Sequence, residues 1–517
     1  MSTTGTSSPS IILTNGCGIS QESHTLGILV GGGPAPGING IIASATLTAL
    51  DRGWTVFGIM EGFRYLMEGR TDMCKRLSRS DVSRIHNTGG TVLCTSRANP
   101  TKKPEDLQRT LDTLKRAGID YLITIGGDDT ATSSLKLANA AGDALKVCHV
   151  PKTIDNDLPL PGDVPTFGYR TAQAVGYDIL RNLMADAKSS PPRWYIVVSM
   201  GRQAGHLALG MGFSAGAHLT LIPEEWGSKP VTFSAIVDAI EGTVLKRLAI
   251  DKPFGVVVLA EGLVEKMLPD EVDRVFDPHH IVSRDEHGHI RLDEVELGGR
   301  VRDELRQRFA GRSPRITWVV KNIGYELRCA DPIPFDIEYT RILGSGAVRF
   351  LAGSGNKAIV TMIGEQLSPI PFQEIINPAT GKSATRAVDT DSLLYKVARE
   401  FMMRLTTNDL GNSELIGRMA AIAKMTPDEF LARYRDTFAE CTTGGDAAMP
   451  STPLRMHAQF DARASTDVPP VSLGNTPVRV RVPVHRVLDM GCASTGGGES
   501  GGTVLGVASV GTPVPEK

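Results

Sequence analysis

The residues that could do chemistry lie in two acidic segments, each after a short apolar run. Gly126-Gly-Asp-Asp-Thr130 follows residues 121–125, and Asp155 and Asp157 follow residues 147–150. Two carboxylates that are two positions apart in an extended segment point the same way. Such groups bind a hard cation such as Mg²⁺ or take a proton from a substrate hydroxyl. An acidic turn that caps the next helix, or an Asx turn, would explain the same residues without a function.

A glycine loop adds backbone donors to these acids. Residues 25–30 predict a strand, Gly31-Gly-Gly-Pro-Ala-Pro-Gly-Ile-Asn39 a loop, and residues 41–50 a helix. Strand, loop and helix N-terminus together place N–H groups against an anion, although a purely structural turn fits as well. The loop lacks the dinucleotide fingerprint because Pro36 replaces its last glycine, and it lacks the Gly-Lys-Ser/Thr of a P-loop.

Basic side chains lie in or beside the same expected loops as the carboxylates and the glycines. Acids for a metal and a base, together with cations for anions, are what phosphoryl transfer requires. The cations in or beside the expected loops are Arg97, Lys152, Arg202 and Arg328.

The elements that must position these residues alternate between strand and helix, which predicts an α/β fold with parallel sheets and ligand loops on one edge. A polar stretch over 277–307 is expected to interrupt the alternation. Strands are predicted over 54–58, 89–97, 121–125, 147–150, 194–199, 219–222, 254–260 and 316–320, and helices over 62–67, 105–117, 133–141, 166–187, 337–351 and 393–405.

Composition narrows the function class. A chain of 517 residues predicts two or three units, and a formal net charge of −2 gives no nucleic-acid footprint. Seven cysteines without a Cys-x-x-Cys pair favour a reducing cytoplasm. The N-terminus does not resemble a signal peptide. The longest apolar stretch, 206–222, falls short of a membrane span, so no membrane partner is expected.

Three regions are expected along the chain. Residues 1–24 predict a flexible tail, residues 25–408 the folded domain, and residues 409–517 a C-terminal extension. Residues 413–439 could form two amphipathic helices, the second with a capped start at Thr426-Pro-Asp-Glu429. Beyond Cys441 the composition is typical of a low-complexity segment.

Taken together, the motifs resemble those of 6-phosphofructokinases, in the same order and over about residues 25–408. This resemblance implies two similar Rossmann-like lobes with mostly parallel sheets, an active site in the cleft between them, and a homodimer or homotetramer. It also implies Mg²⁺-dependent transfer of a phosphoryl group to the 1-hydroxyl of fructose 6-phosphate, a step of glycolysis. The motifs are Gly31-Gly-Gly-x-x-Pro-Gly-x-Asn39, Gly126-Gly-Asp-Asp-Thr130, Pro151-Lys-Thr-Ile-Asp-Asn-Asp157, Met200-Gly-Arg202, Glu261-Gly262 and Tyr325-x-x-Arg328.

The resemblance also implies roles for single residues. Asp155 would be the general base, Asp128 the Mg²⁺ carboxylate, and Asp157 a support for the metal or the phosphate geometry. Arg97 would lie near the transferred group, and Arg193 would reach the 6-phosphate of a neighbouring subunit unless it is only a solvated charge. The backbones of Gly32 and Gly33 would bind the phosphoryl donor, and the sugar-phosphate pocket would comprise Thr153, Ile154, Asp155, Met200, Gly201, Arg202, Glu261, Tyr325 and Arg328.

Asp129 and Lys152 resemble the pyrophosphate-dependent branch, since ATP-dependent members generally carry glycine at both positions. Some ATP-using relatives also carry lysine at 152, so the choice of phosphoryl donor depends on Asp129. A carboxylate at 129 would occupy the place of a nucleotide α-phosphate, where like charges in a partly desolvated pocket repel. Lys152 would neutralise pyrophosphate or the leaving phosphate. The alternatives are an ATP-dependent enzyme and a catalytically silent regulatory subunit, although retention of Asp128, Asp155 and Arg202 argues against the second.

Two positions depart from the family pattern. Pro34 stands where many relatives have an aspartate, which removes a direct metal ligand there. Ala43 and Leu47 stand where allosterically regulated bacterial members carry effector-binding arginines, so nucleotide control of that type is not expected.

Overall fold

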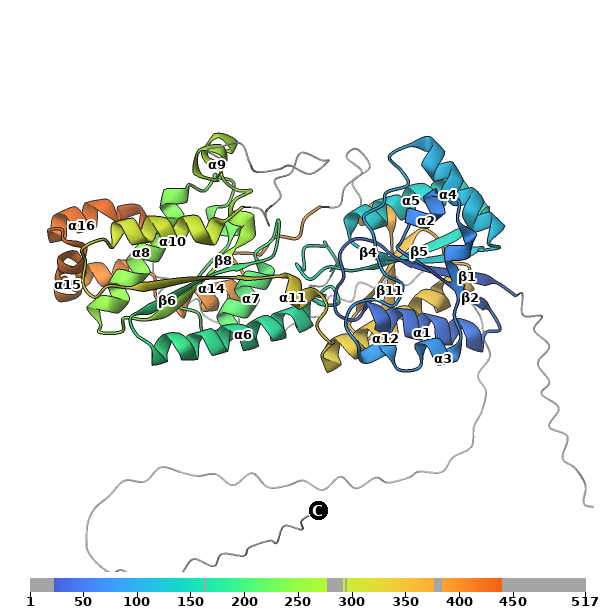
Figure 1. Cartoon of the computed structure of the whole chain (residues 1–517), viewed down its shortest axis with the longest axis horizontal. Helices are drawn as coiled ribbons and strands as arrows, with labels where there is room; N and C mark the ends of the chain where they lie inside the picture. The colour runs from blue at the N-terminus through green and yellow to red at the C-terminus, as the bar shows by residue number, and fades with distance from the viewer. Residues whose placement is uncertain (1–22, 162–163, 277–291, 293–294, 376–383, 439–517) are drawn as a thin grey trace, which may run out of the picture. The chain divides into compact units, whose positions relative to one another are not determined.

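The computed structural model describes residues 23–161, 164–276, 292, 295–375 and 384–438, all within one compact unit, Met1–Gly445. Two β-sheets organise these residues (Figure 1). The first sheet has the strand order β11-β10-β5-β4-β1-β2-β3, in which only the two edge pairs, β10–β11 and β2–β3, are antiparallel. Its strands are β1 (Thr25–Val30), β2 (Thr55–Ile59), β3 (Cys74–Arg76), β4 (Tyr121–Gly126), β5 (Lys146–Pro151), β10 (Ala358–Ile363) and β11 (Gln366–Pro371).

Helices cover both faces of this sheet because its central strands are buried on both sides. In β1, Ile28 and Val30 join the core under α1 and α12, whereas Leu29 between them joins the core on the opposite face. Figure 1 shows α1, α3 and α12 on one face and α2, α4 and α5 on the other. The bounds are α1 (Ile38–Asp51), α2 (Arg64–Met67), α3 (Arg79–Val82), α4 (Pro104–Arg116), α5 (Asp128–Ala141), α12 (Pro334–Ala352) and α13 (Phe372–Ile375).

The second sheet is wholly parallel, with the order β7-β8-β6-β9. Its strands β6 (Arg193–Ser199), β7 (Leu219–Leu221), β8 (Gly255–Ala260) and β9 (Thr317–Ile323) are rich in β-branched residues. The largest buried core of the described residues lies around them. The surrounding helices are α6 (Tyr169–Ser189), α7 (His206–Ala215), α8 (Phe233–Ala249), α9 (Pro269–Phe276), α10 (Leu297–Arg308), α11 (Tyr325–Arg328) and α14 (Leu393–Glu400).

The α/β class and the mostly parallel sheets are confirmed, but several single elements are not. The strand predicted over 89–97 is wrong: only Ser96 forms a bridge, to Gly31. The segment instead wraps the Asn39 side chain, which donates to the carbonyls of Thr88 and Gly89 and accepts from the N–H of Val92. The polar stretch predicted to interrupt the alternation over 277–307 is wrong at its end, because residues 297–307 belong to helix α10. The strands β3, β10 and β11 and the helices α7 and α8 were not predicted.

Two C-terminal helices are confirmed, α15 (Ser413–Ala423) and α16 (Pro427–Arg433). Thr426 caps α16 in a capping box with Glu429, as its sequence indicated. Phe430 joins the core of the second sheet. The domain limit near residue 408 stays a prediction, and residues 1–22 of the predicted tail and the low-complexity segment lie outside the described residues. His24, the last residue of the predicted tail, instead forms a hydrogen bond from its Nδ1 to Asp120 (2.6 Å). Within the described ranges, no helix has the length and apolar character to cross a membrane.

Candidate active site

The polar loops of the first sheet meet at the carboxyl ends of β1, β4 and β5. The N–H of Gly31 donates to Ile125 (2.8 Å), and the N–H of Lys152 donates to Gly126 (2.8 Å). Thr130 packs so closely that a Cβ at Gly31 or Gly126 would lie 2.4 Å from its side chain. Glycine is therefore required at both positions for the three loops to converge.

Lys152 and Arg328 place two cations against the glycine loop. The Lys152 side chain is buried, and its Nζ donates to the carbonyl of Gly33. Arg328, from α11, lies so near that a Cβ at Gly33 would be 2.1 Å from its Nη2. Burial, followed by repulsion from Arg328, lowers the pKa of Lys152 to about 8. The loop thus faces concentrated positive charge in a poorly solvated place, which suits a compact polyanion.

Asp155 is a carboxyl group with an unusually high proton affinity. Its side chain is half-buried, and its Oδ1 is shielded from solvent without a hydrogen-bond partner. Burial, with repulsion from Asp157 and Glu261, raises the pKa of Asp155 to about 7, against the attraction of Arg328 and Lys152. Burial also raises the pKa of Asp157. A carboxylate with a pKa near neutrality is suited to accept a proton.

Loops of the second sheet supply the remaining polar groups. The N–H of Gly201 donates to Oε1 of Glu261 (3.1 Å), and a Cβ at Gly262 would lie 2.3 Å from the carbonyl of Arg202. The N–H of Met200 donates to Ile323 (2.9 Å). Arg328, which follows β9 of this sheet, lies against Gly33, so loops of the two sheets meet at the glycine loop. Glu261 adds to the repulsion that raises the pKa of Asp155.

Other predicted residues occupy more varied positions. Arg97 lies close enough to contribute to the lowered pKa of Lys152. The Thr153 hydroxyl accepts from the N–H of Asp155 (3.0 Å), and Ile154 is buried. Tyr325 is exposed, with the Arg328 guanidinium carbon 5.4 Å from its ring centroid.

Arg193 lies at the far end of the strand that leads to Met200. It donates to Asp186 (2.7 Å). The seven residues of β6 span roughly 20 Å, at about 3.3 Å per residue. Arg193 is therefore outside the site of its own chain, and a contact with a neighbouring subunit's site stays a prediction.

Asp128 and Asp129 occupy the first turn of α5, and both are exposed. The partial desolvation expected for Asp129 is therefore not found. The charged side chain that is buried at this sheet edge is that of Lys152. Among the described residues no cluster of three or more His, Cys, Asp or Glu could hold a metal by itself. Mg²⁺ commonly uses one or two carboxylates plus substrate phosphates. Asp128 follows β4 and Asp155 follows the neighbouring β5, so the two carboxylates belong to the same sheet edge, which fits that manner of binding.

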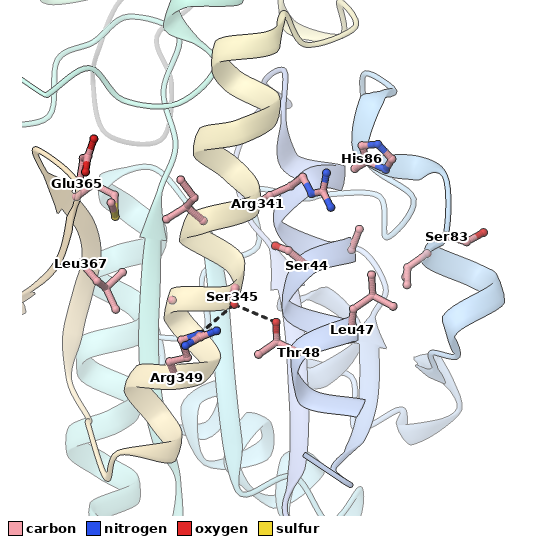
Figure 2. A pocket seen from close by; sticks show the side chains of 15 residues that line it. Ser44, Leu47, Thr48, Ser83, His86, Arg341, Ser345, Arg349, Glu365 and Leu367 are labelled. Carbon is pink, nitrogen blue, oxygen red and sulfur yellow. Dashed lines mark hydrogen bonds between the residues drawn. The ribbon is translucent and has the colours of Figure 1, made fainter. Parts of the chain in front are cut away.

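A hollow of about 580 Å³ lies elsewhere, between α1 and α12 (Figure 2). Ala43 and Leu47 line it from α1, and Arg341 and Arg349 border it from α12. Thr48 donates to Ser345 across it (3.1 Å). None of the predicted site residues lines this hollow.

Sequence reasoning missed Arg386. Its guanidinium donates to the backbone carbonyls of Asn156 (3.0 Å) and Val164 (2.9 Å), so it contacts the loop that carries Asp155. Arg386 belongs to no motif, and an isolated arginine gives no signal of such a contact in the sequence.

These features define an α/β protein in which two mostly parallel sheets direct a glycine loop, the buried Lys152, the Arg328 guanidinium and high-pKa carboxylates to one site. The chain matches the phosphofructokinase family over residues 25–351, and it belongs to that family. A pyrophosphate–fructose 6-phosphate 1-phosphotransferase of Naegleria fowleri is 50% identical over 80% of this chain and 95% of that protein. One from Thermotoga maritima is 49% identical over 80% of this chain and 99% of its own length.

More distant relatives include both donor types. An ATP-dependent 6-phosphofructokinase of Mycobacterium tuberculosis is 32% identical over 68% of this chain and 94% of its own. The solved pyrophosphate-dependent phosphofructokinase of Marinobacter aquaeolei has a TM-score of 0.54 at 18% identity, covering 73% of this chain and 90% of that one. At this identity the likeness supports the two-lobed fold alone.

Proposed function

We propose that the protein transfers a phosphoryl group from pyrophosphate to the 1-hydroxyl of D-fructose 6-phosphate, giving fructose 1,6-bisphosphate and phosphate in a reversible reaction. The observation that carries the choice of donor is Asp129 in the first turn of α5, accompanied by the buried Lys152 ammonium against the glycine loop. The two relatives near 50% identity carry the name of this activity, and the alignment with this chain covers 95% and 99% of their own lengths.

The reaction follows from the placement of the charges. Asp155 accepts the proton of the sugar 1-hydroxyl, whose oxygen attacks the terminal phosphorus of pyrophosphate. The bridging P–O bond breaks, and its electron pair leaves with phosphate. Lys152 and Arg328 stabilise the charge that collects on the transferred and leaving groups. Bound Mg²⁺, held by Asp128 and phosphate oxygens, would supply further neutralisation of that charge.

Substrate positioning falls to the second sheet's loops. Glu261 accepts from the N–H of Gly201, which leaves a carboxylate beside the loop of Met200 and Arg202 to bind sugar hydroxyls. Arg202 would bind the sugar phosphate, whereas Arg328 lies against the donor loop at Gly33. The N–H of Gly33 would bind the donor, and the N–H of Gly32 already donates to the carbonyl of Ser96 (3.0 Å). A homodimer or homotetramer, with Arg193 acting across subunits, and a cytoplasmic location complete the proposal.

The decisive experiment supplies the purified chain with fructose 6-phosphate, Mg²⁺ and either pyrophosphate or ATP. We expect fructose 1,6-bisphosphate from pyrophosphate and little or none from ATP. Strong use of ATP with no use of pyrophosphate would favour the second candidate, an ATP-dependent 6-phosphofructokinase. The Mycobacterium tuberculosis relative carries the name of that activity. Product from neither donor would favour the regulatory subunit.

A further inference from the structure

Asn156, between the two acidic residues of the site, has a backbone conformation that needs support. Its φ is 58°, in the left-handed region, which most residues other than glycine avoid. This turn sets the directions of Asp155 and Asp157 on either side. Asparagine tolerates the left-handed region better than most residues, but tolerance alone does not select it over other conformations.

The side chain of Arg386 holds this turn from outside. Its Nε donates to the carbonyl of Asn156 (3.0 Å), its Nη1 donates to the carbonyl of Val164 (2.9 Å), and its Nη2 donates to Oδ1 of Asn156. Three nitrogens of one planar group thus fix three acceptors. The fixed fork of a guanidinium can do this, whereas the ammonium of lysine cannot.

The backbone around Arg386 extends the same support in two directions. Its N–H donates to the carbonyl of Asp157 (2.7 Å). Its carbonyl accepts from Nε2 of His206 (3.1 Å), at the start of α7, and the hydroxyl of Thr385 donates to Gln203 (2.7 Å). The segment therefore joins the Asp155 loop to the residues that follow Met200-Gly-Arg202.

The Asn156 side chain completes the arrangement. Its Oδ1 also accepts from the N–H of Thr166 (3.1 Å), whose hydroxyl donates to the carbonyl of Thr153 (2.8 Å). The loop of residues 153–157 is thus closed against residues 164–166, with Arg386 as the shared partner. Arg386 lies beyond residues 25–351, which match the family.

We propose that Arg386 is a positioning residue for the general base: it holds Asn156 in the left-handed conformation that aims the Asp155 carboxylate at the sugar hydroxyl. This assignment rests on the proposed function for the identity of the base, but not for the fixing of the loop. Arg386 itself touches no reacting atom in this assignment. Its removal should therefore impair turnover more than substrate binding.

The test compares Arg386→Ala and Arg386→Lys with a control, Arg418→Ala, which removes an exposed arginine paired to Asp251. We expect kcat to fall about 10- to 100-fold in both Arg386 variants, the scale for loss of a group that orients a functional side chain. The KM for fructose 6-phosphate should change by less than about threefold. Millimolar guanidinium should restore part of the kcat of Arg386→Ala, and Arg418→Ala should match the wild type.

Hydrogen exchange measures the loop without any assay of activity. In Arg386→Ala, amides of residues 153–166 should exchange at least about tenfold faster than in the wild type. Unchanged exchange, an unchanged kcat, or a kcat that Arg386→Lys fully retains would overturn the proposal. A wild type that does not use pyrophosphate would refute the proposed function, while faster exchange in the variant would still support the role of Arg386 in the loop.

Discussion

Replacing Asp155 with asparagine should destroy turnover and, at the same time, stabilise the fold. Asparagine keeps the shape of the side chain but cannot take a proton from the sugar. Loss of a general base costs about 10²–10⁴ in rate, which is about 3–6 kcal/mol of transition-state stabilisation at ~1.4 kcal/mol per tenfold. Binding of fructose 6-phosphate should change little, because the remaining sugar contacts are untouched.

The gain in stability follows from the raised pKa of Asp155. The free energy needed to keep this carboxylate charged in the folded protein corresponds to its rise from 3.8 to about 7. At about 1.36 kcal/mol per pKa unit this is roughly 4 kcal/mol. We take this as an upper limit, because the side chain is half-buried and partly solvated.

The raised pKa of Asp155 also makes the free energy of unfolding depend on pH. Between pH 3.8 and about 7 the folded state holds a proton at Asp155 that the unfolded state has lost. Wild-type stability therefore falls through this window as pH rises, relative to Asp155→Asn. The difference between the two proteins should be largest above pH 7 and nearly absent near pH 4.

Two measurements test the prediction. Formation of fructose 1,6-bisphosphate gives kcat and KM, and urea unfolding at pH 4.5 and pH 8 gives the two stability differences. Asp143→Asn is the matched control, since it removes an exposed carboxylate in the turn between α5 and β5 and leaves the proposed base and its neighbours in place. Full turnover in Asp155→Asn, or the same stability difference at both pH values, would refute the reasoning.

The other predictions concern the donor and the ion pairs between α8 and α10. The double variant Asp129→Gly, Lys152→Gly should gain measurable activity with ATP, assayed as fructose 1,6-bisphosphate formed when ATP replaces pyrophosphate. No gain would mean that these two side chains do not exclude the nucleotide. Because burial lowers the pKa of Lys152 to about 8, wild-type use of pyrophosphate should decline as pH rises through that value, and the decline should be absent in Lys152→Arg. Arg308 donates to both Asp238 and the buried Glu241. Arg312 still donates to Glu241 and Arg433 to Asp238. Arg308→Met should therefore reduce the free energy of unfolding by about 1–3 kcal/mol, measured by urea titration, while Arg306→Met on the exposed side should have little effect.

The acidic loops were predictable because their local sequence has few alternatives. Buried parallel strands need apolar runs, and the glycines and carboxylates after those runs can lie only at the sheet edge. For this reason Asp155, Lys152 and the glycine loop were placed correctly relative to the strands that precede them. The capped start at Thr426 was equally local, since a capping box spans four residues.

Contacts between distant segments were not predictable. Arg328 approaches Gly33 from nearly 300 positions away in the sequence, and only the tertiary structure shows that the two cations meet over the glycine loop. The pattern of residues 89–97 predicts a strand, yet the Asn39 side chain hydrogen-bonds the backbone carbonyl of Gly89 and the N–H of Val92. Helix α8 lacks a clear polar face because both the second sheet and the C-terminal helices cover it.

The sequence by itself determined the fold class, the acidic loops and the membership of the phosphofructokinase family, because these depend on short motifs and on the period of apolar residues. Only the tertiary structure decided which charges are buried. It placed Lys152 inside and Asp129 at the surface, raised the pKa of Asp155, and brought Arg386 to Asn156. Burial and charge proximity are sums over neighbours from the whole chain, and no local pattern contains them.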